Sequence, residues 1–143
     1  MAKIEIANSA GFCFGVKRAL DIANNLNENG KKVFTYGPII HNRYVIEDMK
    51  NKGIDVVEQI DKTLLKNSTL VLRSHGVKAS IIQQLEQEKI SFVDATCPFV
   101  KKIHNIVKNM TEDNILFIAG DKNHPEVIGI MGNTKATCYA FNC

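Results

Sequence analysis

Short apolar runs alternate with amphipathic stretches along almost the whole chain. The runs at Lys32–Tyr36, Thr69–Arg73 and Ile115–Ala119 have the length and the β-branched or aromatic content of strands. Between the runs, apolar residues recur at the spacing that gives a helix one apolar face. Strands that alternate with helices are joined by crossover connections, which bring the strands together in parallel. The chain is therefore predicted to be an α/β protein with βα units and a mainly parallel sheet.

The same patterns predict the remaining elements. Glycines at positions 30 and 53 mark the ends of the first two predicted helices, because glycine favours the turn that follows a helix. Further strands are predicted at Lys3–Ala7, Ile54–Val57, Ser91–Asp94 and Tyr139–Phe141, and helices at Val16–Leu26, Asn42–Lys52, Lys78–Lys89 and Val100–Met110.

Charge and hydropathy argue against two kinds of partner. Eighteen Lys and Arg side chains stand against fifteen Asp and Glu, which gives a net charge of +3. This excess is small and evenly spread, so it does not favour binding to nucleic acid. No stretch approaches the roughly 20 apolar residues of a membrane span. The N-terminal residues also lack the apolar core of a signal peptide. We therefore expect a cytoplasmic protein without a membrane partner.

The four cysteines lie at positions 13, 97, 138 and 143. Disulfide frameworks belong to short, cysteine-rich secreted chains, which this chain does not resemble. No two cysteines form a C-x-x-C pair, so neither a zinc ribbon nor a ferredoxin-type run is expected. The cysteines are therefore interpreted as free thiols or as metal ligands brought together from distant loops.

Chemically distinctive residues follow five of the predicted strands. In an open α/β sheet, ligands bind beyond the carboxyl ends of the strands, and parallel strands share that edge. We therefore expect one site there. The candidate residues are two cysteines, three histidines and a glutamate: Cys13, His41, His75, Cys97, His124 and Glu126. The fourth histidine, His104, falls in the middle of a predicted helix and is interpreted as structural.

Most candidates also have a simpler explanation. Cys13 lies between two phenylalanines, and a lone cysteine is commonly a small buried apolar residue. Cys97 precedes a proline, which suits an ordinary helix start as well as a thiolate held by the helix dipole. His41 could cap the following helix, and His75 could be a turn residue before a glycine. Glu126 could merely favour a helix N-terminus electrostatically. The residues alone leave these alternatives open.

Five motifs together resemble the successive signatures of the 4-hydroxy-3-methylbut-2-enyl diphosphate reductases, a family of iron–sulfur oxidoreductases. The motifs are GFCFGVKRA around Cys13, GPIIHN at His41, RSHGV at His75, DATCPFV at Cys97 and HPEVIG from His124. One such motif is a weak signal, whereas five in the family's order across nearly the whole chain are very specific. The chain resembles the N-terminal part of this family.

The resemblance implies three α/β lobes around a central cavity. Residues 1–96 would form the first lobe and residues 97–143 the truncated start of the second, while the third lobe would be absent. The cavity would hold a [4Fe–4S] cluster on three cysteines, and Cys13 and Cys97 match the first two. The third lies beyond the equivalent of residue 143. Neither Cys138 nor the last residue falls where the family has a ligand.

The resemblance also implies the chemistry. His41, His75 and His124 match residues that line the substrate pocket and hold the diphosphate, and Glu126 matches the acid of the proton relay. The family removes an allylic hydroxyl to give isopentenyl and dimethylallyl diphosphates, in the methylerythritol phosphate pathway of isoprene biosynthesis. Electrons would come from a donor such as ferredoxin or flavodoxin. With one ligand missing, the chain as given is expected to be an inactive fragment.

There are two alternative functions, of which the second fits the sequence poorly. Cys13, Cys97, His41 and His124 could form a mononuclear metal-binding module without a redox role, which zinc without sulfide would favour. A Rossmann-type nucleotide-binding regulatory domain should carry G-x-G-x-x-G after its first strand, and the spacing from Gly11 to Gly15 does not fit.

Overall fold

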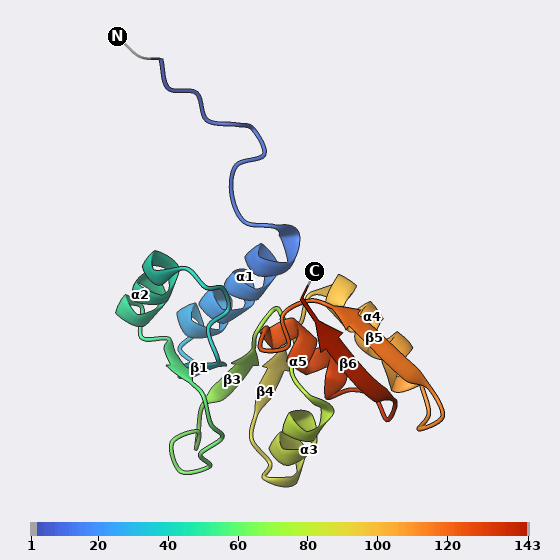
Figure 1. Ribbon diagram of the computed structural model, residues 1–143. Helices are drawn as coiled ribbons and strands as arrows, with labels where there is room; N and C mark the ends of the chain where they lie inside the picture. The colour runs from blue at the N-terminus through green and yellow to red at the C-terminus, as the bar shows by residue number, and fades with distance from the viewer. Residues whose placement is uncertain (1–2, 143) are drawn as a thin grey trace.

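A four-stranded parallel sheet forms the centre of the computed structural model, which describes residues 3–142 (Figure 1). Its strand order is β2-β1-β3-β4, and every neighbouring pair is parallel. The strands are β1 (Val33–Tyr36), β2 (Asp55–Val57), β3 (Thr69–Leu72) and β4 (Phe92–Asp94), and the helices around them are α1 (Phe14–Glu28), α2 (Arg43–Asn51) and α3 (Ala79–Gln87). The predicted α/β class is confirmed.

Helices cover both faces of this sheet. On one face, α1 and α2 bring Ala19, Ala23 and Met49 against the sheet residues Val33 and Val71. On the other face, α3 packs its apolar side over alternate residues of the same strands; that cluster holds Phe34, Leu65, Leu70, Leu72, Val77, Leu85 and Ile90. Since successive strand residues point to opposite faces, β1 and β3 are apolar almost throughout, as expected for a buried parallel sheet.

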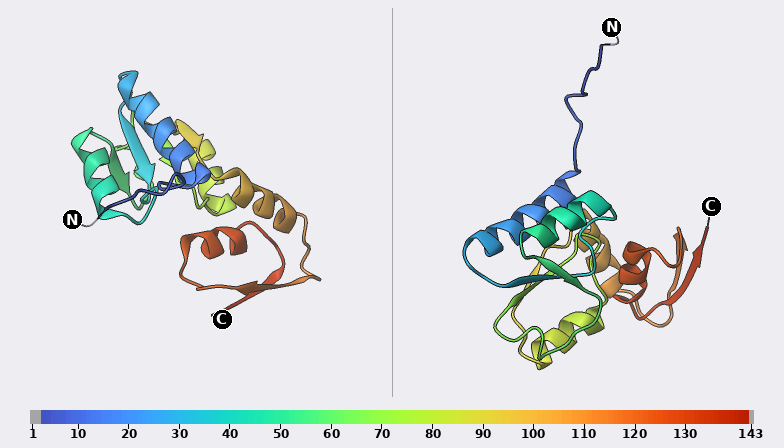
Figure 2. Two further views of the ribbon diagram at one scale, coloured as in Figure 1. Left: turned by 90° about the horizontal axis from the view of Figure 1, so that it is seen from above. Right: turned by 90° about the vertical axis from the view of Figure 1, so that its left-hand side faces the viewer.

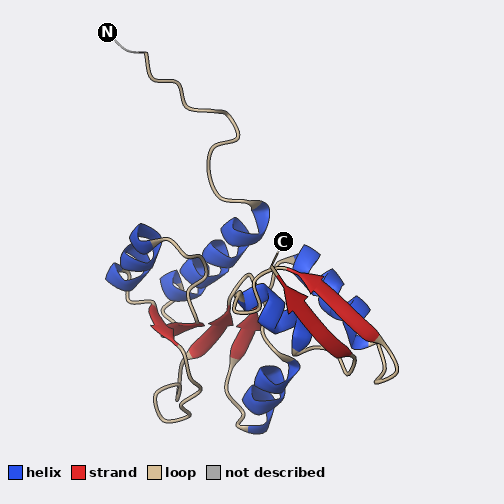
Figure 3. Cartoon of the chain, in the orientation of Figure 1, coloured by secondary structure: helices blue, strands red, loops and turns tan. Residues whose placement is uncertain are grey.

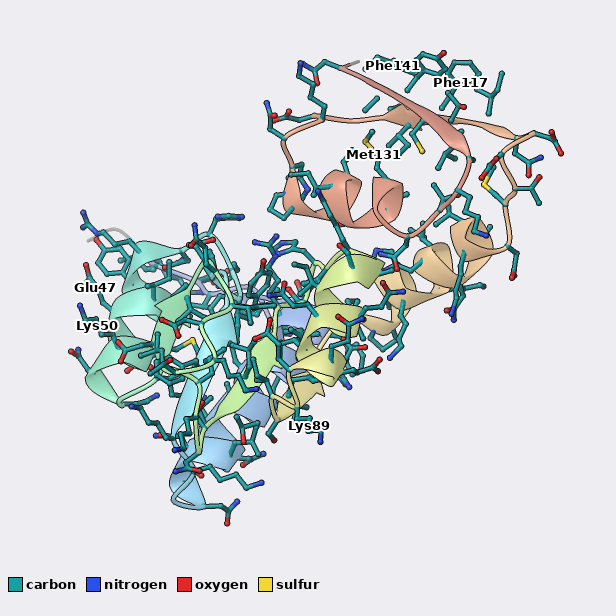
Figure 4. The ribbon with its side chains drawn as sticks, turned by 90° about the horizontal axis from the view of Figure 1, so that it is seen from below. Glu47, Lys50, Lys89, Phe117, Met131 and Phe141 are labelled. Atoms are coloured by element: carbon teal, nitrogen blue, oxygen red, sulfur yellow. The ribbon has the colours of Figure 1, made fainter. Side chains whose placement is uncertain are left out.

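A second unit follows the sheet along the chain. Helix α4 (Pro98–Lys108) leads to a parallel pair, β5 (Ile115–Ala119) and β6 (Thr137–Phe141), joined by α5 (Pro125–Met131). Helices α4 and α5 pack together beside the first sheet (Figure 2). Figure 4 shows Phe117 and Phe141 on the side of this pair away from α5. The Phe117 ring stacks on Tyr139, and both side chains are more than half exposed.

The strand predicted at Lys3–Ala7 is wrong. The segment runs away from the rest of the molecule as a loop (Figure 3). Ile4 and Ile6 are 89% and 82% exposed. The alternating pattern is that of a strand, but strands are stabilised by hydrogen bonds and side-chain pairs from a neighbour. No other segment of residues 3–142 pairs with this one.

The other strand predictions are confirmed, with ends that differ by at most two residues. The four predicted helices are also confirmed, but α5 was not predicted. Its signal was present, since Pro125 occupies the first turn, where proline suits a helix. The proposed division after residue 96 falls in the loop between β4 and α4 and stays a prediction. No helix among the described residues is long and apolar enough to cross a membrane.

Candidate functional site

Three histidines from separate segments gather at the carboxyl edge of the first sheet. His41 follows β1, His75 follows β3, and His124 is the residue before α5. The centroid of the His75 ring lies 5.7 Å from that of His41 and 5.7 Å from that of His124. His41 and His124 are exposed, whereas His75 between them is half-buried. The sequence prediction that these loops meet is correct for the histidines.

Helix N-termini add hydrogen-bond donors to this edge. The side chain of Asn42, not that of His41, caps α2 by accepting from the backbone N–H groups of Tyr44 and Val45. His41 is therefore not needed as a cap. The Nδ1 atom of His124 accepts from the backbone N–H of Glu126 at 3.2 Å, so His124 does cap α5. Glu126 is half-buried in the first turn of this helix, where a carboxylate is electrostatically favoured.

The histidines form a site that favours negative charge. Burial, with Arg73, His41 and His124 as nearby positive groups, lowers the pKa of His75 from 6.5 to about 4. The Nδ1 atom of His75 is buried without a hydrogen-bond partner among the described residues. If this free nitrogen carries the ring hydrogen, it can donate to an anionic ligand, which the flanking basic groups also favour.

Two cysteines lie at the starts of helices beside this edge. Cys13 is the N-cap residue of α1 and Cys97 that of α4, and neither thiol makes a capping hydrogen bond. A Cβ atom added to Gly15 would lie 2.7 Å from the Sγ atom of Cys97, so the absence of a side chain there makes room for that thiol. Chain geometry then limits the distance between the Cα atoms of Cys13 and Cys97 to about 13 Å.

Ser74 connects the histidine loops with the second cysteine. Its hydroxyl donates to the backbone carbonyl of Ile39 at 3.0 Å, which holds the His41 loop against the His75 loop. Its own carbonyl accepts from the backbone N–H of Cys97 at 2.8 Å. Three loops therefore meet at one buried serine.

Comparison with known proteins agrees with this arrangement. The family model described as LytB protein matches residues 4–142. The chain belongs to the LytB family. It is 45% identical over 144 residues to the 4-hydroxy-3-methylbut-2-enyl diphosphate reductase of Caldanaerobacter subterraneus subsp. tengcongensis, covering 98% of this chain and 50% of that protein. It is 48% identical over 130 residues to the enzyme of the same name from Clostridium perfringens, covering 89% and 46%.

Solved structures show the same relation. A structure of (E)-4-hydroxy-3-methyl-but-2-enyl diphosphate reductase superposes with a TM-score of 0.75 at 39% identity, over 96% of this chain and 51% of that one. The E-1-hydroxy-2-methyl-but-2-enyl-4-diphosphate reductase of Plasmodium falciparum superposes with a TM-score of 0.83 at 28% identity, over 94% and 42%. The chain thus spans about half the length of the relatives it matches.

The LytB chain offers part of a ligand set for an iron–sulfur cluster. Cys13 and Cys97 could hold part of such a cluster, because their Cα atoms lie within about 13 Å of each other and their thiols make no capping bonds. Among residues 3–142, no three His, Cys, Asp or Glu side chains are grouped so that they could hold a metal ion. The alternative mononuclear site of Cys13, Cys97, His41 and His124 is therefore not formed. Cys138 is a free thiol in β6, and Cys143 lies outside the described residues.

His104 of this LytB chain packs as the sequence suggested. A Cβ atom on Gly76 would lie 2.6 Å from the Cε1 atom of His104, and one on Gly129 would lie 3.2 Å from its Nε2 atom. The ring thus fills the space between the loop after β3 and helix α5. Burial lowers the pKa of His104, which further favours the neutral ring.

Arg73 is the residue that sequence reasoning missed. The sequence pattern predicts Arg73 only as the last residue of an apolar strand. In the structure, its guanidinium lies close enough to His75 to lower the pKa of that ring. Gly37 has a φ of +67°, and a Cβ atom there would lie 2.5 Å from the Nη1 atom of Arg73. The one usable signal was the cation itself, since a charge at the end of a buried strand is uncommon.

Proposed function

We propose that this chain is part of a reductase that removes the allylic hydroxyl of 4-hydroxy-3-methylbut-2-enyl diphosphate. The observation that carries the proposal is the meeting of three histidines with two cysteines at helix N-cap positions beside one edge of a parallel sheet. The relatives named as this reductase support the choice of substrate. The products would be isopentenyl and dimethylallyl diphosphates, and the protein would act in the cytoplasm.

The histidines are proposed to bind the diphosphate. His41, His75 and His124 present ring nitrogens from three loops, and the N-termini of α2 and α5 lie next to two of them. Ring N–H groups and helix N-termini both favour phosphate oxygens. A bound diphosphate would also stabilise a proton on His75, because it supplies the negative charge that this crowded site lacks.

Cys13 and Cys97 are proposed to hold a [4Fe–4S] cluster together with a third cysteine from the remaining half of the protein. The bound cluster would supply single electrons and an iron without a protein ligand, to which the substrate hydroxyl could bind. The role of this chain is to set the positions of two ligands, which the starts of α1 and α4 provide. The electron donor is proposed to be a ferredoxin or a flavodoxin.

Glu126 is proposed to supply a proton for the leaving hydroxyl. The net reaction adds two electrons and two protons, breaks the carbon–oxygen bond, forms a carbon–hydrogen bond and releases water. Hydroxide is a poor leaving group, so protonation by a positioned acid lowers the barrier. Glu126 is half-buried in the first turn of α5, two residues after His124, and this proximity to a proposed diphosphate ligand supports the role.

A chimera tests the function. Residues 1–142 would replace the N-terminal half of the Clostridium perfringens relative and be joined to its C-terminal half. The replaced half is 48% identical to this chain over 130 residues. Prepared without oxygen, the chimera should contain iron and sulfide and should turn over substrate with a chemical reductant. Cys13→Ser or Cys97→Ser should abolish both cluster and turnover, whereas Lys50→Gln on exposed α2 should change neither. A chimera with an intact cluster spectrum but no turnover would contradict the proposal.

A further inference from the structure

A small cavity lies behind the histidine cluster, between the start of α3 and helix α5. Its volume is about 160 Å³, and none of the three histidines lines it. Apolar walls come from Ile81 on α3 and from Pro125 and Ile128 on α5. The polar groups in the wall are the side chains of Arg73, Lys78 and Tyr36, so the cavity combines two cations and a hydroxyl with an apolar lining.

Arg73 is the unusual member of this group. Its side chain is half-buried, and its Nε atom is buried without a hydrogen-bond partner among the described residues. None of the ion pairs within residues 3–142 includes it. A guanidinium has five N–H donors and no acceptor, so it needs oxygen atoms from elsewhere when it leaves water. An anion in the adjoining cavity would provide them.

Backbone contacts fix the positions of the residues that line the cavity. Gly37 packs against the guanidinium of Arg73, and its φ of +67° is a conformation that other residues adopt at a cost. A Cβ atom on Gly132 would lie 2.7 Å from the Cβ atom of Lys78, so the stem of this lysine crosses the end of α5. The backbone N–H of Ala79 donates to the carbonyl of Gly132 at 3.1 Å, which fixes α3 to α5.

The hydroxyl of Tyr36 is suited to donate into the cavity. Burial raises the pKa of Tyr36, with the negative charge of Glu58 acting in the same direction and the charge of Arg73 opposing both. The phenol therefore keeps its proton near neutral pH. Lys78 lines the cavity while its side chain is exposed, so its long stem can carry the ammonium group to an anion bound there.

We propose that this cavity binds a small oxyanion, a phosphate or a carboxylate that carries at most a short alkyl group. The volume holds about five water-sized groups, which fits inorganic phosphate or a short carboxylate. Two oxygens of the anion would accept from the guanidinium of Arg73 in the bidentate geometry that arginine favours. The alkyl group would contact Ile81 and Ile128.

An anion bound here would bridge the first sheet and α5. Helix α5 carries Glu126 and is capped by His124, so occupancy of the cavity would stabilise the segment that presents these residues. The proposal does not depend on the reductase function, because none of the three histidines lines the cavity.

Titration of the 143-residue chain followed by NMR tests the proposal. Inorganic phosphate and isobutyrate would be added separately to ¹⁵N-labelled protein, with sodium chloride keeping the ionic strength constant. At least one anion should shift the Nε–H resonance of Arg73 and the signals of Ile81 and Ile128 along saturable curves. The anion that saturates identifies the ligand as a phosphate or as a carboxylate.

Matched variants complete the test. Lys78→Gln should weaken binding by about twofold to fivefold, the range for losing one ion pair at an exposed position. Lys50→Gln removes the same charge from α2 and should leave the affinity unchanged (Figure 4). Arg73→Gln should abolish saturation, and its amide spectrum would report whether it still folds.

Three results would overturn the proposal. The first is a response of Arg73 that stays linear with both anions. The second is an equal affinity of Lys78→Gln and Lys50→Gln. The third is saturation confined to the resonances of His41, His75 and His124, which would assign the binding to the histidine cluster.

Discussion

Adding a diphosphate to the histidine cluster should raise the pKa of His75. Burial and the neighbouring groups Arg73, His41 and His124 hold this pKa at about 4 in the free protein. A diphosphate would place negative charge against the ring and would thereby stabilise its protonated form. Inorganic pyrophosphate, the simplest probe, should therefore bind with uptake of a proton at pH values between the pKa values of the free and the bound states.

The size of the effect follows from the shift. A fall from 6.5 to about 4 corresponds to roughly 3 kcal/mol if the charges are unscreened, at about 1.4 kcal/mol for each pKa unit. Because His75 is only half-buried, solvent screening reduces this to about 1–2 kcal/mol. The same free energy contributes to the pH dependence of folding. Above pH 6.5 the His75 ring is neutral in the folded and the unfolded protein. As the pH falls towards 4, only the unfolded chain takes up the proton, so the folded protein loses stability.

Two measurements check this reasoning. The chemical shift of the His75 ring C–H, followed against pH, should give a midpoint near 4 without pyrophosphate and a higher midpoint with it. In urea unfolding, His75→Gln should reduce the loss of folding free energy between pH 6.5 and 4. His104 also has a lowered pKa, so the variant His104→Gln, measured in parallel, gives the share of the loss that belongs to that histidine. A midpoint near 6.5 in the free protein, or one that pyrophosphate does not move, would refute the reasoning.

Three further substitutions have defined outcomes. Asn42→Ala removes the side chain that caps α2, so it should lower the free energy of unfolding by about 1 kcal/mol in urea titrations, whereas Asn42→Asp should retain most of it. Gly15→Ala places a Cβ atom 2.7 Å from the Sγ atom of Cys97, and should therefore reduce iron incorporation in the chimera without unfolding it; unchanged iron content would show that the thiol has room to move. Glu126→Gln in the chimera should leave the cluster spectrum intact and lower turnover by roughly 100-fold, the scale for a positioned acid. Near-normal turnover would mean that the proton comes from another group.

The sequence predicted the sheet well because its signals are local. Apolar runs between amphipathic helices identify β1, β3 and β5, and the neighbours that complete these strands are supplied within the same chain. The segment Lys3–Ala7 carries an equally clear local pattern, and it fails because pairing depends on a partner that alternation does not reveal. The pattern of a strand is therefore necessary for pairing but does not establish it.

The site was predictable in its residue types and in part of its geometry. That the ends of parallel strands share an edge was enough to bring His41, His75 and His124 together. It did not predict the mutual packing of Arg73 and Gly37, because a contact between a side chain and a left-handed glycine leaves no periodic trace in the sequence. The shared edge also did not distinguish helix capping from ligand binding at His124. In the structure, the Nδ1 atom of His124 caps α5, and the other ring nitrogen remains available to a ligand.

Ser74 shows why a short motif can carry more structural information than its individual residues suggest. Within RSHGV, the serine has neither the charge of Arg73 nor the ring of His75, and no pattern in the sequence distinguishes it. Its hydroxyl donates to the carbonyl of Ile39 and its backbone carbonyl accepts from the N–H of Cys97, so it fixes one loop on each side of His75. The hydroxyl makes the first contact from a buried position, and the backbone makes the second. The spacing between the histidines proposed to bind diphosphate and the proposed cluster ligand Cys97 therefore depends on Ser74, which has neither role.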